Sequence, residues 1–234
     1  MKVLIIVPAY NEELNIVKVV EDIRNNTNYD YVVINDGSKD RTKEICEKNK
    51  FNLISLPVNY GLTSAVQVGM KYALKNQYDV AIQFDGDGQH QAKELKKLVE
   101  KMNKNDIVIG SRFVTETKSK TVRMLGSNMI SLIIKLTTGK IIHDPTSGMR
   151  AYNKEIIQEL VSNSGLSPEP DMLVYMLKKN KKIEEVQVEM KEREFGESYL
   201  KPTKAVQYMV NMFCSIIFIR SFTRRNNGGE KLCQ

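Results

Sequence analysis

The chain alternates short apolar runs with longer segments in which apolar residues recur every three or four positions. The apolar runs cover residues 3–7, 31–34, 53–56, 79–84 and 106–110. Continuous runs of this kind are typical of parallel strands that are buried on both faces. The segments between them have the spacing of amphipathic helices. This order predicts an α/β fold, an open and mostly parallel sheet with helices on both faces.

The alternation ends beyond residue 112. Polar residues rich in Lys and Thr predict a loop over 114–122, and turn residues dominate 143–150. Helical spacing returns over 123–138, 154–162 and 170–179. Residues 183–190 alternate between apolar and polar positions, which predicts a half-exposed strand.

The segment 203–225 is apolar and closes with Arg220, Arg224 and Arg225. It is too short and too polar to span a bilayer. An apolar helix with a basic end suits the membrane interface, and the alternative is a helix docked on the core or on a second subunit. We therefore expect one large α/β domain over 1–200, an interfacial helix over 201–225 and a disordered tail over 226–234.

Composition narrows the class of protein. The 234 residues suit one large domain, and the net charge of +7 favours an anionic partner such as a nucleotide, nucleic acid or anionic membrane. The three cysteines include no Cys-x-x-Cys pair, so we expect neither a disulfide framework nor a zinc site. The lack of a disulfide framework leads us to expect a reducing compartment. No apolar run is long enough for a signal peptide or a spanning helix.

Two carboxylates, Asp85 and Asp87, follow the apolar run 79–84, with glycine on either side of Asp87. Like charges this close repel one another, and a divalent cation removes that cost. Mg²⁺ or Mn²⁺ often takes one or two carboxylates plus substrate phosphates, and Gln89 could add a neutral oxygen. The alternative is a polar turn, because Asp-Gly is ordinary turn chemistry. A calcium loop is excluded, since His90 stands where that loop needs glycine.

Polar groups also follow three other strands of the predicted sheet. They are Pro8, Tyr10 and Glu12 after the first, Asp36 after the second and Arg112 after the fifth. Ligands of open α/β sheets bind beyond the carboxyl ends of the strands, so we expect these groups at one rim. The chain has neither a Gly-x-Gly-x-x-Gly after its first strand nor a Walker motif, which argues against a nicotinamide dinucleotide site or a P-loop.

Together these stretches resemble family 2 glycosyltransferases, in the branch of dolichyl-phosphate mannose synthases and bacterial polyprenyl-phosphate glycosyltransferases. Six motifs keep the family's order: VPAYNE at 7–12, INDGS at 34–38, NYGL at 59–62, DGDGQH at 85–90, GSRF at 110–113 and DPTSGMR at 144–150. The resemblance implies a GT-A fold, a nucleotide-sugar donor and an inverting transfer that needs Mg²⁺ or Mn²⁺.

The resemblance also implies roles for individual residues. Metal ligands are Asp85, Asp87 and Gln89. Donor contacts are Pro8, Tyr10, Glu12, Ile34, Asp36, Asp85, Gly86, Asp87 and Arg193. The acceptor phosphate faces Arg112, Arg123 and Ser127, and the groups at the reacting atoms are Asp87, Arg112 and Arg123. Two positions depart from the family: Asn35 replaces the first Asp of Asp-Asp-Gly-Ser, and Tyr199 replaces a Lys, with Lys201 nearby.

The nucleophile distinguishes two reactions. A sugar hydroxyl needs a general base, for which Asp144 is the candidate. A lipid phosphate, with a second pKa of about 6, is mostly ionised at pH 7 and needs cations instead. Arginine suits that role, and Arg112, Arg123, Arg150 and Arg193 are available. Arg150 could equally form a structural salt bridge, and Arg123 a solvated helix start.

We therefore predict a peripheral enzyme on the cytoplasmic face of the cell membrane. It would move one sugar from a UDP- or GDP-sugar to polyprenyl phosphate, for cell-wall or surface glycans. The alternatives are transfer to a sugar hydroxyl and a non-catalytic nucleotide-sugar binding module. The chain lacks an aromatic–basic stacking surface, which argues against nucleic acid. A small membrane protein or a second subunit could dock on the C-terminal helix.

Overall fold

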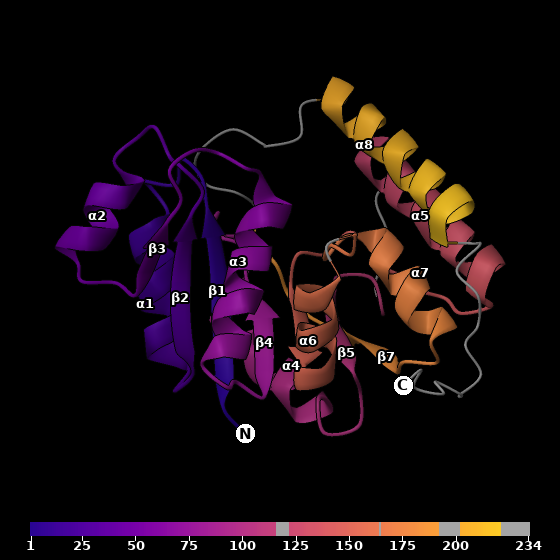
Figure 1. The fold of residues 1–234 in the computed structure, drawn as a ribbon, viewed down its shortest axis with the longest axis horizontal. Coiled ribbons are helices and arrows are strands. Elements are labelled where there is room, and N and C mark those ends of the chain that lie inside the picture. Colours follow the sequence, from indigo (N-terminus) through magenta and orange to yellow (C-terminus); the bar gives the residue numbers. More distant parts are fainter. Residues whose placement is uncertain (116–121, 164, 192–201, 221–234) are drawn as a thin grey trace, which may run out of the picture.

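A seven-stranded mixed sheet forms the centre of the computed structural model, which describes residues 1–115, 122–163, 165–191 and 202–220 (Figure 1). In sheet order the strands are β3 (Leu53–Ser55), β2 (Asp30–Asn35), β1 (Val3–Ala9), β4 (Val80–Gln83), β6 (Arg150–Asn153), β5 (Ile107–Ser111) and β7 (Ile183–Gln187). All neighbours pair in parallel except β6, which is antiparallel to both β4 and β5. The predicted open, mostly parallel sheet is confirmed.

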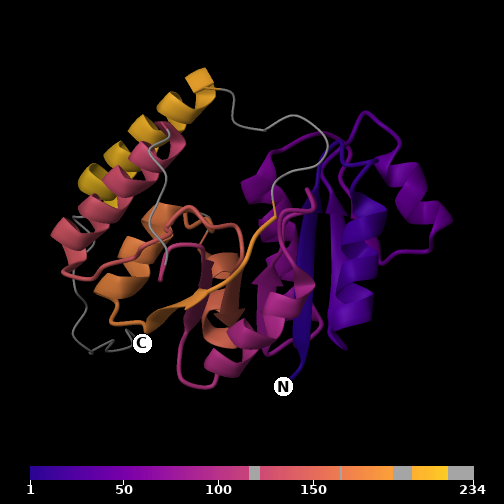
Figure 2. The same ribbon diagram turned by 180° about the vertical axis from the view of Figure 1, so that it is seen from behind.

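Helices cover both faces of the sheet (Figures 1 and 2). One face packs on α1 (Ile16–Asn26), α2 (Thr42–Lys48) and α4 (Leu95–Lys101), the last preceded by the 3₁₀ turn Ala92–Glu94. The other packs on α3 (Leu62–Lys75), α6 (Lys154–Ser162) and α7 (Pro170–Lys178). Along β1, Leu4 and Ile6 enter one apolar cluster while Val3, Ile5 and Val7 enter the other. Both faces of β1 are therefore buried, as its unbroken apolar run predicts.

Strand β6 was not predicted, because its four residues follow directly on the turn-rich segment 143–150. It lies between β4 and β5, with Arg150 opposite both Gln83 and Ile109. Since β6 runs against its neighbours, it begins at the edge where β4 and β5 end. The insertion therefore carries residues 144–149 to the carboxyl ends of those strands.

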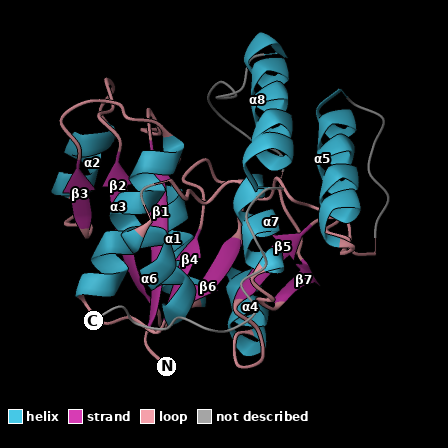
Figure 3. Cartoon of the chain, turned by 45° about the vertical axis from the view of Figure 1, so that its right-hand side comes forward, coloured by secondary structure: helices cyan, strands magenta, loops and turns pink. Residues whose placement is uncertain are grey.

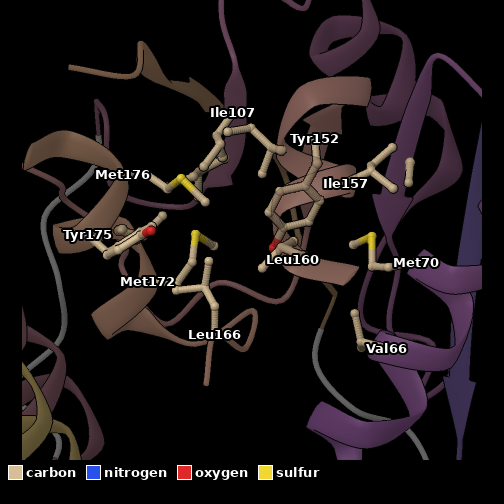
Figure 4. Close-up of a cluster of buried hydrophobic side chains, with 14 of the residues drawn as sticks. Val66, Met70, Ile107, Tyr152, Ile157, Leu160, Leu166, Met172, Tyr175 and Met176 are labelled. Carbon is tan, nitrogen blue, oxygen red and sulfur yellow. The ribbon is translucent and has the colours of Figure 1, made fainter. Parts of the chain in front are cut away.

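Tyr152 anchors this strand in the core. Its ring is fully buried, and Figure 4 shows it among Ile157 and Leu160 on one side and Met172 of α7 on the other. Its hydroxyl has no hydrogen-bond partner among the residues that the structure describes, and burial raises the pKa of that hydroxyl. Burying so large a ring favours this register of the strand over others.

Two helices, α5 (Val122–Thr138) and α8 (Pro202–Cys214), lie side by side at the upper right of Figure 1, and Figure 3 shows them from a second direction. They cross closely at Gly126, where a Cβ would lie 1.7 Å from the sulfur of Met209. The segment predicted over 203–225 begins as α8 and continues as the π-helical turn Ser215–Arg220. The predicted tail 226–234 lies outside the described residues. Within the described ranges, every helix is too short or too polar to cross a bilayer.

The sequence placed the start of the first helix too early. In the sequence, apolar residues recur at helical spacing from Leu14 onwards and Asn11 is a plausible N-cap, but α1 begins at Ile16. Asn11 adopts φ +56° and joins two loops instead, since its side-chain oxygen accepts from the backbone N–H of Lys39 and its own N–H donates to Ser38 Oγ. The loops that follow β1 and β2 are thereby tied together.

Candidate active site at the carboxyl ends of the strands

The turn Asp85–Gly86–Asp87 leaves β4 at the carboxyl edge of the sheet. His90 braces this turn, because its Nδ1 accepts the backbone N–H of Asp85 at 3.0 Å. The imidazole is nearly buried and packs edge-on against Phe84, with 5.3 Å between ring centroids. Gly86 is required for close approach, since a Cβ there would lie 2.9 Å from the carbonyl oxygen of Pro8. His90 is thus a structural residue of the turn.

The carboxylates of this turn have few partners. Asp85 Oδ1 accepts from Gln83 Nε2 at 3.4 Å, and Asp87 Oδ1 accepts from the backbone N–H of Gln89 at 3.1 Å. Within the described part of the chain neither forms an ion pair with Lys or Arg, and the side chain of Asp85 is 29% exposed. His90 Nε2 lies 3.8 Å from Asp85 Oδ2. Two accessible carboxylates without a Lys or Arg partner among the described residues are a suitable ligand pair for a divalent cation.

The described residues contain no group of three His, Cys, Asp or Glu side chains that could enclose a metal. A cation held by Asp85 and Asp87, with Gln89 beside them, would therefore need further oxygen ligands from a substrate and from water. This is how Mg²⁺ is commonly bound beside nucleoside phosphates. The donor set fits the predicted metal, and the assignments of Asp85, Asp87 and Gln89 as its ligands stay predictions.

Gly148 of the segment 144–149 packs directly against Asp85. A Cβ at Gly148 would lie 2.2 Å from Asp85 Oδ2 and 2.8 Å from its carboxyl carbon. Any side chain there would push the carboxylate out of place. The sequence contained Gly148 in a matching motif, but only the fold reveals that it sets the position of Asp85.

The donor residues predicted on β1 and β2 differ in accessibility. Pro8 and Ile34 are buried partners across the β1–β2 pair, so only their backbone could face a ligand. Tyr10 is partly exposed at the strand end. Glu12 is nearly buried and accepts from Asn15 Nδ2 at 2.7 Å. Asp36 is nearly buried, and its carboxylate accepts the backbone N–H groups of Tyr60 and Gly61 at 2.9 and 2.8 Å.

Asp36 thus holds the loop that opens α3, in addition to the nucleoside role predicted for it. Gly61 at this point adopts φ +91°, a backbone conformation that favours glycine. The asparagine that departs from the family pattern, Asn35, is also nearly buried and donates to Ser55 Oγ at 2.7 Å. In this fold it links β2 to β3, so its side chain is directed into the sheet edge.

Arg112 and Asp144 form a bidentate ion pair at the end of β5. Arg112 Nε and Nη2 donate to the two carboxylate oxygens of Asp144 at 2.8 and 3.0 Å, and the backbone N–H of Arg112 lies 3.3 Å from Oδ2. The side chain of Asp144 is fully buried, whereas that of Arg112 is 25% exposed. Arg112 can still face a ligand, but Asp144 cannot reach an acceptor hydroxyl. The structure therefore argues against Asp144 as a general base.

Replacing Asp144 with asparagine should therefore reduce stability instead of removing a base. Breaking a buried ion pair from one side costs about 3–5 kcal/mol, and the partial exposure of Arg112 favours the lower end. Urea unfolding would measure the loss, with Asp30→Asn at the opposite edge of the sheet as the control. If Asp144→Asn left stability unchanged and abolished transfer, Asp144 would regain its candidacy as the base.

Arg150 is a structural residue, so its candidacy as a phosphate ligand is wrong. Its guanidinium is nearly buried and donates to three backbone carbonyls, those of Pro145, Ser147 and Pro168. Among the described residues, these bonds satisfy the buried charge and Arg150 forms no ion pair, which differs from the salt bridge considered as the alternative. They hold the segment 144–149 in the shape that brings Gly148 to Asp85.

The remaining acceptor residues are only partly visible. Ser127 is nearly buried in α5, and Thr146 Oγ1 lies 3.4 Å from its hydroxyl. Arg123 lies in the first turn of α5, but its side chain is outside the described part of the structure. Arg193, Tyr199 and Lys201 lie outside the described residues. The acceptor assignments for Arg123, Ser127 and Arg193 stay predictions.

Sequence reasoning missed two carboxylates at this rim. Glu185 of β7 accepts the backbone N–H groups of His143 and Asp144 at 2.6 and 2.7 Å. Glu169, which precedes α7, accepts from Thr63 Oγ1 at 2.8 Å and from the hydroxyl of Tyr208. An acid before a helix is ordinary capping chemistry, so nothing in the local pattern marked Glu169 as a contact between α3 and α8.

Comparison with known proteins identifies the family. Residues 4–161 match the model described as "Glycosyl transferase family 2". The chain belongs to this family. As a family 2 member it is a glycosyltransferase, and the predicted resemblance is confirmed.

Relatives cover most of the chain. An undecaprenyl-phosphate mannosyltransferase of Micrococcus luteus is 30% identical over 91% of this chain and 93% of its own length. A dolichol-phosphate mannosyltransferase of Pyrococcus furiosus is 33% identical over 91% of this chain and 63% of its own. Glucosyl-3-phosphoglycerate synthase from Mycobacterium tuberculosis, solved with Mn²⁺, UDP and phosphoglyceric acid, superposes with a TM-score of 0.66. It is 16% identical, covering 94% of this chain and 78% of its own, so it confirms the GT-A fold alone.

Proposed function

We propose that this glycosyltransferase moves one sugar, with inversion, from a UDP- or GDP-sugar to polyprenyl phosphate. The names of relatives that cover most of the chain support this acceptor: one is an undecaprenyl-phosphate and another a dolichol-phosphate mannosyltransferase. The reaction would supply lipid-linked sugar for cell-wall or surface glycans. A second, independent argument comes from the hydrogen bonds that the carboxylates of the site accept.

The observation that carries the proposal is that the rim carboxylates around Asp85 and Asp87 are already engaged. Five carboxylates at this rim accept hydrogen bonds from the protein: Glu12, Asp36, Asp144, Glu169 and Glu185. The first three are nearly or fully buried. A sugar hydroxyl would need a base within hydrogen-bond reach. A phosphate monoester is already ionised at neutral pH and needs none. The described rim therefore suits a phosphate nucleophile better than a hydroxyl.

Asp85 and Asp87 would hold the Mg²⁺ or Mn²⁺ and orient the donor diphosphate. When bound, the metal would neutralise the negative charge that develops on the leaving diphosphate. Arg112 is ion-paired yet partly exposed, so its guanidinium could hold the acceptor phosphate while Asp144 fixes its plane. Arg123, Ser127 and Arg193 complete the acceptor side in this proposal.

The membrane side of the enzyme is proposed to be formed by α5 and α8. Besides its buried face, α5 carries a second apolar face of exposed side chains at helical spacing: Leu125, Met129, Leu132 and Leu136. The adjacent α8 exposes Val210 and Phe213. Residues 122–138 and 202–220 contain no Asp or Glu, but they do contain basic residues. A protein surface with exposed apolar side chains, basic residues and no acidic residues suits contact with an anionic membrane.

Replacing Leu132 with glutamate should weaken binding to anionic lipid vesicles about tenfold, because a side chain proposed to enter the lipid becomes charged. Leu14→Glu is a matched control, since Leu14 is similarly exposed but lies in the β1–α1 connection. Co-sedimentation with vesicles measures both variants. Equal binding by the two variants would mean that α5 does not face the membrane.

Transfer of radiolabelled sugar into organic-extractable lipid tests the function. Purified protein is mixed with polyprenyl phosphate, Mn²⁺ or Mg²⁺, and a panel of UDP- and GDP-sugars. Labelled lipid that disappears with EDTA is the expected result, and the panel identifies the sugar and the base. Donor binding without labelled lipid would instead favour a hydroxyl acceptor. Absence of donor binding would contradict the whole proposal.

A further inference from the structure

Helix α8 carries a contact that no step of the proposed transfer uses. The hydroxyl of Tyr208 donates to Glu169 Oε2, and Thr63 Oγ1 donates to Glu169 Oε1 at 2.8 Å. Burial and the nearby Glu169 carboxylate raise the pKa of the Tyr208 hydroxyl, so it remains a protonated donor at neutral pH. One carboxylate thus joins α8 to the first turn of α3.

The first turn of α3 is directly connected to the donor side of the site. Gly61, two residues before Thr63, donates its backbone N–H to Asp36 at 2.8 Å, and Tyr60 donates to the other oxygen. Only one residue, Leu62, separates this loop from Thr63. A displacement of Thr63 would therefore move the N–H groups that hold the Asp36 carboxylate.

The other end of α8 is anchored in the protein. Ser215 Oγ donates to Asp171 Oδ2 at 2.7 Å, and Ile216 is fully buried in the core. Between these anchors Met209 lies against Gly126 of α5. The inner face of α8 therefore contacts both the donor-side helix α3, through Glu169, and the acceptor-side helix α5, while Val210 and Phe213 on its outer face are exposed.

We propose that Tyr208 is a positioning residue that couples contact of α8 with an anionic membrane to binding of the nucleotide donor. The coupling would pass from Tyr208 through Glu169 and Thr63 to the loop held by Asp36. It rests on the proposed function, since it assumes a nucleotide donor and a membrane-facing α8. Linkage requires that vesicles tighten nucleotide binding by the same factor by which nucleotide tightens vesicle binding.

The chain offers a closely matched pair of variants. Tyr208→Phe removes one hydroxyl that donates to a glutamate and keeps the ring. Tyr175→Phe removes the same kind of bond, from Tyr175 Oη to Glu159 Oε1 at 2.9 Å, between α7 and α6 away from the rim. A general loss of stability would affect both variants, whereas loss of coupling should affect Tyr208→Phe alone.

The first readout is the affinity for UDP and GDP with Mn²⁺, measured with and without phosphatidylglycerol vesicles that contain no acceptor. We expect vesicles to tighten binding about fivefold in the unmodified enzyme and in Tyr175→Phe, at the lower end of typical coupling between sites. Tyr208→Phe should bind nucleotide as well as the unmodified enzyme without vesicles and gain nothing from them. Equal gains in both variants, or no gain in the unmodified enzyme, would overturn the inference.

The second readout is hydrogen–deuterium exchange in residues 60–66. Vesicles should slow exchange there in the unmodified enzyme and in Tyr175→Phe but not in Tyr208→Phe, because only the last lacks the link to Glu169. Slowing in all three would exclude Tyr208 from the coupling. Neither readout requires an acceptor, so vesicle coupling without labelled lipid would overturn the proposed acceptor and leave this inference standing.

Discussion

Asp87→Asn is expected to reduce sugar transfer about 10³-fold or more while the protein stays folded. The carboxylate is partly exposed, and among the described residues it accepts a hydrogen bond only from the backbone N–H of Gln89. The side-chain oxygen of asparagine can accept the same bond. The fold therefore loses little. The site loses a charge that would hold the divalent cation against the donor diphosphate, and electrostatic stabilisation of this kind commonly contributes more to catalysis than any other effect.

Three measurements separate loss of the metal from loss of the fold. Transfer, thermal unfolding and Mn²⁺-dependent nucleotide binding are compared with those of Asp30→Asn. Asp30 begins β2, at the end of the sheet away from the candidate site, and asparagine there can still accept from the hydroxyl of Tyr78. We expect the Asp30 variant to remain active. If Asp87→Asn retained full activity, or if transfer by the unmodified enzyme proved insensitive to EDTA, the metal assignment would be wrong.

Gly148→Ala is expected to reduce transfer about 100-fold, although the residue itself carries no functional group. The new Cβ would lie 2.2 Å from Asp85 Oδ2, so the carboxylate must rotate away. A short side chain can make that movement at small cost to the fold, but a misplacement of about 1 Å at a reacting centre commonly costs about 10² in rate. Stability should therefore change much less than activity.

Gly165→Ala is the matched control, because a Cβ there meets Asn163 Oδ1 at an ordinary 3.5 Å. Raising the Mn²⁺ concentration should partly restore transfer by Gly148→Ala, since the displaced ligand weakens metal binding instead of abolishing it. An active Gly148→Ala enzyme would show that Asp85 tolerates displacement and is not a metal ligand. A variant that fails to fold, with Gly165→Ala folded, would instead make Gly148 a packing residue.

Both predictions concern the turn that carries the two candidate metal ligands, against which the polar loop 144–149 packs. The guanidinium of Arg150 donates to the carbonyls of Pro145, Ser147 and Pro168. These hydrogen bonds fix the conformation of the loop in which Gly148 packs against Asp85. Asp144 from the same loop fixes Arg112. A single segment therefore positions a candidate metal ligand and a candidate phosphate ligand, which is a physical reason for its density of polar and turn residues.

Much of the fold could be predicted because local patterns carry it. Within the apolar runs, residues 3–7, 32–34, 80–84 and 107–110 are buried, so hydrophobicity alone marks these strands. Strand β6 could not be predicted, because four residues carry too little periodicity and its place between β4 and β5 is a long-range pairing. The same limit explains Asn11, whose cross-loop bonds to residues 38 and 39 replaced a capping role.

The candidate site divides in the same way. The sequence alone determined which residues could bear charge at strand ends, Asp85 and Asp87 above all, and the order of motifs that marks the family, because these are properties of neighbours along the chain. Only the tertiary structure decided which charges remain accessible. Arg150 and Asp144 are buried with their hydrogen-bond partners, whereas Arg112 is paired with Asp144 and still partly exposed. Glu169 joins α3 to α8. Burial and pairing depend on residues far apart in sequence, so no local pattern could reveal them.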